Sequence, residues 1–143
     1  MSYDLNAYLR SESFPTLAVI REQLQRAGGR VLIADEIDFT KDTGHVAVIL
    51  DGAPTGFEVY SSEIDEDRRA RYRARLERAK ARPDEHLSIL ESCDFDLSFN
   101  CQAKDEREVT AARLVMTAIA TAANGWFCDP QTGKTVRLNE EST

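Results

Sequence analysis

The alternation of apolar and polar positions is clearest between residues 94 and 102. There Phe95, Leu97, Phe99 and Cys101 alternate with polar side chains, which predicts a strand with one buried face and one wet face. Weaker alternation and β-branched runs predict further strands. These are 3–10 (at an edge of the sheet), 31–39, 45–50, 56–61, 126–128 and 134–138.

Helical spacing marks three other segments. Leu17, Ile20 and Leu24 recur with the period of a helix that ends at Gly28-Gly29. Residues 62–81 carry only a narrow apolar stripe, so we expect that helix to face water over most of its surface. Residues 105–124 carry a wide apolar side, which predicts the central helix of the core.

The predicted order of elements is β-α-β-β-β-α-β-α-β-β, which favours an α+β fold. We expect one domain over residues 1–143, with an antiparallel sheet and the first and last helices on one face. The helix at 62–81 would be an extra, charged helix. The wet strand faces indicate that the opposite face of the sheet is open, or covered only by that charged helix.

Charge is distributed unevenly along the chain. The net charge is −7, yet residues 68–82 hold eight Lys or Arg and one Glu, a net of +7, so the remainder carries −14. A mainly acidic surface repels phosphates and disfavours nucleic acid as a partner. It favours a cationic protein partner, whose approach it would accelerate.

Motifs for catalysis or metal binding are missing from the pattern. The two histidines, His45 and His86, stand in unlike settings without neighbouring Cys or His, and we expect both to be exposed or bonded within turns. The cysteines form no CxxC pair, and Cys101 and Cys128 lie in apolar runs typical of core thiols. We therefore predict a protein that is not an enzyme and holds no metal or cofactor.

Carboxylates are the best candidates for a site. Asp94 and Asp96 would share the wet face of one strand with Asn100, and Glu36 and Asp38 would do so on another. If the strands pair, these side chains form one acidic, partner-binding surface. The same pattern fits a sheet face that is merely solvated, or one that the arginines of residues 68–82 cover and neutralise. It also fits a small-molecule site or an enzyme that uses this polar face.

The segment from Asp94 to Lys134 resembles the C-terminal half of small bacterial α+β proteins. It carries a strand, the alanine-rich stretch EVTAARLVMTAIATAANG and the turn DPQTG. Some proteins of this kind are similar to immunity proteins encoded beside secreted bacterial toxins. The resemblance implies an immunity-type inhibitor that neutralises a toxin, and it transfers no site residue.

The location of the protein is predicted from two segments. The start, MSYDLNAYLR, lacks the basic and apolar regions of a targeting signal. The most apolar stretch, Leu114–Ala123, is shorter than the roughly 20 residues that a bilayer requires. We expect a soluble cytoplasmic protein with no membrane partner, and the pattern leaves its oligomeric state and any toxin or ligand open.

Overall fold

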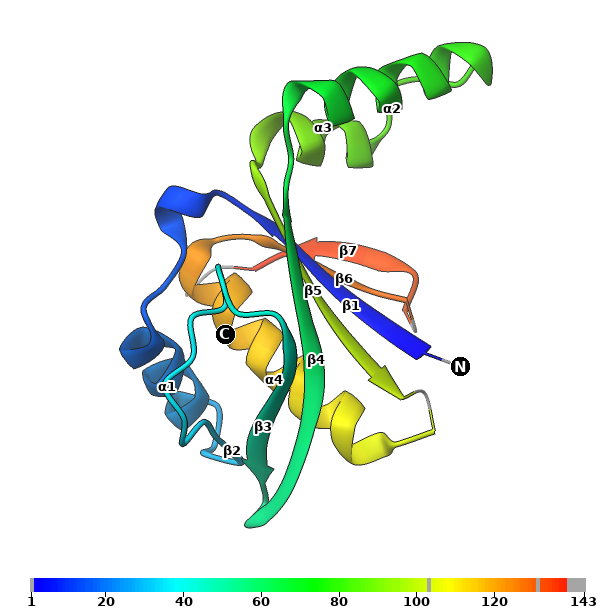
Figure 1. The fold of residues 1–143 in the computed structure, drawn as a ribbon. Coiled ribbons are helices and arrows are strands. Elements are labelled where there is room, and N and C mark those ends of the chain that lie inside the picture. The colour runs from blue at the N-terminus through cyan, green and yellow to red at the C-terminus, as the bar shows by residue number, and fades with distance from the viewer. Residues whose placement is uncertain (1, 103, 131, 139–143) are drawn as a thin grey trace.

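The computed structural model describes residues 2–102, 104–130 and 132–138, which form an antiparallel sheet and helices (Figure 1). The elements are β1 (Ser2–Leu9), the 3-10 turn η1 (Ser11–Ser13), α1 (Leu17–Arg26), β2 (Val31–Leu32), β3 (Gly44–Leu50), β4 (Ala53–Glu63), α2 (Glu66–Arg78), α3 (Glu85–Ser92), β5 (Phe95–Gln102), α4 (Glu106–Ala123), β6 (Trp126–Asp129) and β7 (Lys134–Arg137).

The strands form one sheet in the order β2-β3-β4-β5-β1-β6-β7, and every pairing is antiparallel. The α+β class is therefore confirmed. The prediction that the first strand lies at an edge is wrong. The hairpin of β6 and β7 pairs with the side of β1 that β5 leaves open, so β1 lies inside the sheet.

One face of the sheet carries the core. α4 packs along β1, β4 and β5, and α1 packs beside α4. Leu5, Leu97 and Phe99 point from the strands to this side and are completely buried, as are Val115 and Ile119 of α4. Burial of this kind contributes roughly 1.5–3 kcal/mol for each large apolar side chain. The prediction of two helices on one face is confirmed.

The other face of the sheet has no helix along its centre. α2 and α3 lie together beyond the ends of β4 and β5 (Figure 1). Asn6, Tyr60, Ser98 and Asn100 share the uncovered face, because each stands opposite or two residues from the next in the strand register. The alternation in 94–102 thus predicted correctly which side chains of β5 point inward.

The strand predicted over 31–39 is wrong beyond Leu32. The chain leaves the sheet after two residues and turns at Asp38, whose carbonyl oxygen accepts hydrogen bonds from the backbone of Lys41 and Asp42. Phe39 is nevertheless 1% exposed and packs on Phe99, with ring centres 5.7 Å apart. The alternation of apolar residues in this segment therefore indicates which side chains are buried, but it does not indicate that the segment pairs in the sheet.

The charged helix begins later than predicted. β4 continues to Glu63, and α2 starts after Asp65, whose carboxylate accepts a hydrogen bond from the backbone N–H of Arg68. α3 was not predicted. Its cap is Asp84, which follows the Pro83 that ends the preceding helical pattern, and its apolar side is too short to stand out.

Arg69 joins α2, α3 and the sheet. Its guanidinium donates to the carbonyl oxygens of Leu90 (2.6 Å), Ile64 (3.0 Å) and Cys93 (3.0 Å). A small second core is formed by Ile64, Ile89, Leu90 and Cys93, three of which accept these hydrogen bonds. One residue of the arginine-rich segment is therefore a structural clamp.

No helix within the described residues is long and apolar enough to cross a bilayer. This agrees with the prediction drawn from Leu114–Ala123.

Candidate functional site

Two adjoining clefts open beside η1 and the segment that follows β2. The first has a volume of about 440 Å³ and lies between η1, the start of α1 and residues 37–40. The second has a volume of about 550 Å³ and lies at the ends of β4 and β5. Ser11 and Thr40 line both, so the two are parts of one depression, which we call the acidic cleft.

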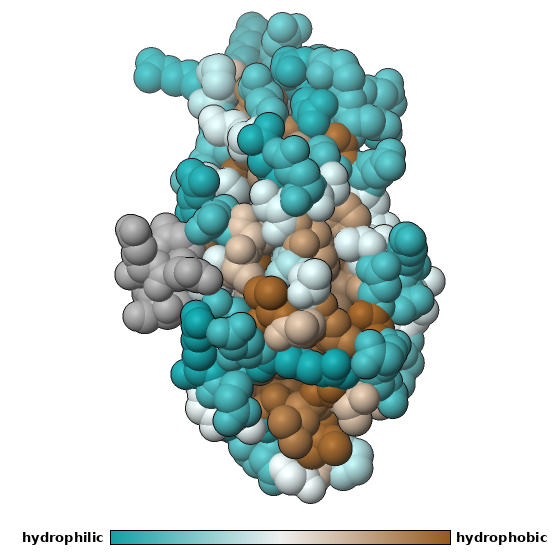
Figure 2. All heavy atoms as spheres, turned by 90° about the vertical axis from the view of Figure 1, so that its left-hand side faces the viewer, coloured by the Kyte–Doolittle hydropathy of each residue, from teal (hydrophilic) through white to brown (hydrophobic). Residues whose placement is uncertain are grey.

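The first part of the acidic cleft is mainly apolar. Phe14, Leu17 and Ile37 line it and are half-buried, while Ile20 and Phe39 form its floor and are 1% exposed each. Figure 2 looks onto the α1 side of the molecule. It shows apolar side chains over the middle and lower parts and mainly hydrophilic ones over α2 and α3. Half-buried apolar side chains beside polar ones are typical of surfaces that bind other molecules.

The second part of the cleft is polar and contains Asp94. Its carboxylate accepts hydrogen bonds from the backbone N–H of Ser11 (2.6 Å) and from the Ser11 hydroxyl (2.8 Å). Partial burial raises the pKa of Asp94, but the bonds from Ser11 outweigh it and the net pKa lies below its ordinary value. Asp94 is therefore an ionised, fixed carboxylate at neutral pH.

Asp38 is held in the same way on the opposite part of the cleft. The Thr40 hydroxyl (2.5 Å) and backbone N–H (2.9 Å) donate to its carboxylate. These bonds lower the pKa of Asp38. The two residues at the junction of the clefts, Ser11 and Thr40, thus orient one carboxylate each.

The charge of the acidic cleft has one sign. Glu63, at the end of β4, is exposed and is the third carboxylate in the lining. Of the described residues that line the two clefts, none is Lys, Arg or His. Arg10 and Lys41 lie close enough to lower the pKa of Asp94 and Asp38 but stand outside the lining. The cleft can therefore accommodate a cationic group from outside the chain.

The predicted acidic surface is dispersed in the structure, so the expectation that its four carboxylates share one wet face is wrong. Asp38 and Asp94 both line the acidic cleft, although neither lies in a strand. Glu36 lies outside the cleft lining and forms an exposed ion pair with Arg21 at 3.4 Å. Asn100 does lie on the uncovered face, where its side-chain amide donates to Asp4 at 2.5 Å.

Asp96 is neutralised by the arginine-rich helix. Its side chain is 11% exposed, and it accepts from Arg68 at 2.9 Å and from Asn6 at 3.0 Å. This is the alternative in which the chain's own arginines cover an acid of the sheet face. Arg68 is the arginine for which this holds. Arg71 pairs with Asp67 of its own helix, and Arg73 pairs with Glu66 and, at 3.9 Å, with Glu91 of α3.

Sequence reasoning missed most of the residues that line the cleft, among them Ser11, Phe14, Thr40 and Glu63. Ser11 lies in η1, Phe14 follows η1 and Glu63 ends β4, and no local pattern connects them to Asp94. A local signal did exist for Thr40, because an Asp followed two residues later by Thr commonly forms a side-chain-to-backbone turn.

Histidine and cysteine lie elsewhere in the molecule. His45 is exposed as predicted, but His86 is half-buried in α3, with its ring 5.6 Å from Tyr8 and 4.9 Å from Tyr72. Cys101 is in the core as predicted, whereas Cys128 is half-buried on the uncovered sheet face. In the part of the chain that the structure describes, no three acidic, His or Cys side chains are grouped to hold a metal ion.

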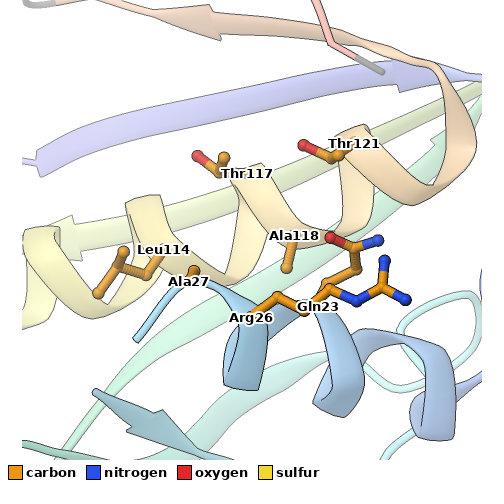
Figure 3. A pocket seen from close by; sticks show the side chains of 7 residues that line it. All are labelled: Gln23, Arg26, Ala27, Leu114, Thr117, Ala118 and Thr121. Atoms are coloured by element: carbon orange, nitrogen blue, oxygen red, sulfur yellow. The ribbon is translucent and has the colours of Figure 1, made fainter. Parts of the chain in front are cut away.

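A smaller cleft of about 210 Å³ separates α1 from α4 (Figure 3). Leu114, Ala118 and Ala27 supply its apolar lining. The buried hydroxyl of Thr121 has no hydrogen-bond partner among the described residues, but in Figure 3 it points away from Gln23 and Arg26 of α1. The polar groups of this cleft do not converge, so it is the weaker candidate for a site.

Comparison with models of known protein families, with curated proteins and with solved structures finds no match to this chain.

Proposed function

We propose that this chain is a binding protein that receives a cationic segment of a protein partner in the acidic cleft. The specific form that we propose is an immunity-type inhibitor, which neutralises a bacterial toxin by covering its basic surface. The resemblance of the segment from Asp94 to Lys134 to immunity-like proteins motivates this form.

The observation that carries the proposal is the combination of charge and shape in the acidic cleft. Asp38, Glu63 and Asp94 face no Lys or Arg among the described lining residues, and the adjoining half is apolar. A partner segment with Lys or Arg next to a large apolar side chain complements both halves. The apolar anchor would supply residence time, and the carboxylates would accelerate association.

A small-molecule site or an enzyme is the second candidate, because the two volumes lie within the usual range for ligand sites of about 300–1,000 Å³. The state of the carboxylates argues against acid–base catalysis. The pKa values of Asp38 and Asp94 are lowered, so these groups hold a proton poorly near neutral pH. Carboxylates that stay ionised at neutral pH are suited to binding a cation.

The test compares two variants with the same change in net charge. D38N/E63Q/D94N removes the carboxylates of the cleft, and E77Q/E85Q/E106Q removes three exposed carboxylates on α2, α3 and α4. Each variant and the wild-type chain serve as bait for proteins of the source cell, and the activity of any captured protein is assayed with and without bait. Circular dichroism confirms that both variants are folded.

We expect the wild type and the control variant to capture the same basic protein and to inhibit it, and the cleft variant to lose at least about tenfold in affinity, or roughly 1.4 kcal/mol. Equal capture by both variants would rule out the acidic cleft as the interface. A captured protein that keeps its full activity would contradict the inhibitor form of the proposal.

A further inference from the structure

A second cleft, separate from the acidic one, lies where several elements end. Its volume is about 320 Å³. It is bounded by the chain between β1 and η1, by the last residues of α3 and α4, and by β6 and β7 (Figure 1). We call it the arginine cleft, after Arg10 and Arg137 in its lining.

The charge of the arginine cleft is opposite to that of the acidic cleft. Arg10 and Arg137 are exposed, and the described lining residues include no Asp or Glu. Both arginines lie close enough to the Cys93 thiol to lower its pKa, although burial acts more strongly and raises it. Both arginines therefore line one cleft and lie in the neighbourhood of the same thiol.

The donors of both arginines are largely uncommitted within residues 2–102, 104–130 and 132–138. Arg137 donates through Nε to the carbonyl oxygen of Asn124 at 3.4 Å, and its terminal nitrogens make no hydrogen bond there. Arg10 makes only a long, exposed ion pair with Glu12 at 3.7 Å. Such an exposed pair contributes little and is easily exchanged for a better acceptor.

The helix ends at this cleft do not require two arginines. A cation near a helix C-terminus is stabilising in general. Here the last turns are already capped, because the N–H of Cys93 donates to Ile89 in α3 and the N–H of Gly125 donates to Ala120 in α4. Backbone hydrogen bonds therefore close both last turns, and Arg137 adds one long bond from Nε to Asn124, the C-cap of α4.

The remaining lining can contact the aromatic ring of a ligand. Trp126 is half-buried and supplies apolar surface, and the hydroxyls of Ser13 and Ser92 supply further polar contacts. Arginine pairs with carboxylate and phosphate oxygens through two parallel hydrogen bonds, so a pair of arginines selects an oxyanion.

We propose that the arginine cleft binds a small aromatic oxyanion, with its phosphate or carboxylate group between Arg10 and Arg137 and its ring against Trp126. The site shares no lining residue with the acidic cleft, and the proposal does not rest on the proposed function, although Arg10 also acts on Asp94. It adds a ligand-binding activity to a protein-binding one.

Trp126 is the only tryptophan of the chain, and its fluorescence reports directly on the site. The full chain is titrated at constant ionic strength with phenyl phosphate, benzoate and inorganic phosphate. We expect a saturable change with phenyl phosphate or benzoate, and the tighter of the two identifies the head group. Inorganic phosphate should bind more weakly than phenyl phosphate, because it lacks a ring.

R10Q and R137Q should each weaken binding about tenfold, since each removes a charge-assisted, two-bond contact. R26Q is the matched control, because Arg26 is an exposed arginine of α1 that pairs with Glu22. Its affinity should equal that of the wild type. No saturable response to any of the three anions would overturn the proposal. Unchanged affinity in both R10Q and R137Q would do so as well, and would leave these arginines a purely structural role at the helix ends.

Discussion

At the scale of the residue, the fate of each carboxylate depends on its nearest donor. Asp94 and Asp38 accept from Ser11 and Thr40, which are neutral, so their negative charge stays available to a partner. Asp96 accepts from Arg68, and its charge is cancelled within the chain. Sequence alone assigns these three residues the same role, because the donors to Asp94 and Asp96 come from distant parts of the chain.

The Arg68–Asp96 pair leads to a prediction of stability. Arg68→Met leaves the carboxylate of Asp96, 11% exposed, with Asn6 as its remaining partner. We expect a loss of about 2 kcal/mol, below the usual 3–5 kcal/mol for breaking a buried pair, because Arg68 is 29% exposed. Urea unfolding measures this loss.

The double variant R68M/D96N provides the control for that prediction. Replacing Asp96 by Asn removes the unpaired charge, so the double variant should recover most of the lost free energy. If the losses of R68M and D96N simply add, the pair does not interact in the way that the structure indicates.

At the scale of the element, patterns predicted burial better than they predicted pairing. The period-two pattern of 31–39 places Val31, Ile33, Ile37 and Phe39 on one face. Val31, Ile33 and Phe39 are buried, and Ile37 is half-buried. It could not show that the chain leaves the sheet after Leu32, because this depends on hydrogen bonds around Asp38 and on the two-residue contact with β3. Residues of the segment where this prediction was wrong line part of the acidic cleft. The spacing of apolar residues therefore could not predict the geometry of the cleft.

The α2–α3 pair is the element whose packing should respond to pH. His86 packs between Tyr8 of β1 and Tyr72 of α2, with Arg68, Arg75, Asp84 and Asp96 acting on it. Burial lowers the pKa of His86, and the attraction of Asp84 only partly offsets this. The unfolded chain therefore takes up the proton first as the pH falls below about 6.5, the ordinary histidine value.

We accordingly expect the free energy of unfolding to decrease between pH 7 and pH 5, and the decrease to be smaller in His86→Gln. Urea unfolding at pH 7, 6 and 5 compares the two proteins. The carboxylates with lowered pKa values, such as Asp84 and Asp94, lose their contribution only at lower pH. An equal decrease in both proteins would show that His86 is not the responsible group.

For the whole molecule, the order of elements predicted the class of fold and the composition predicted the sign of the charge, but neither predicted how the charge is arranged. The α+β class and the two helices on one face follow from the element order and from the apolar side of residues 105–124. The excess of −14 outside residues 68–82 is not gathered on the sheet. Part of it lines the acidic cleft, while Arg10 and Arg137 define a cleft of opposite sign near the other side of η1.

The central claim is that the acidic cleft receives a cationic segment, and an NMR titration tests it most directly. The ¹⁵N-labelled chain is titrated with the peptide Lys-Leu-Lys-Lys and, separately, with Glu-Leu-Glu-Glu. Only the basic peptide should shift the backbone signals of the cleft residues Ser11, Asp38, Thr40, Glu63 and Asp94. These shifts should be lost in D38N/E63Q/D94N and kept in E77Q/E85Q/E106Q. Shifts scattered over the surface, or the same response in both variants, would contradict the claim.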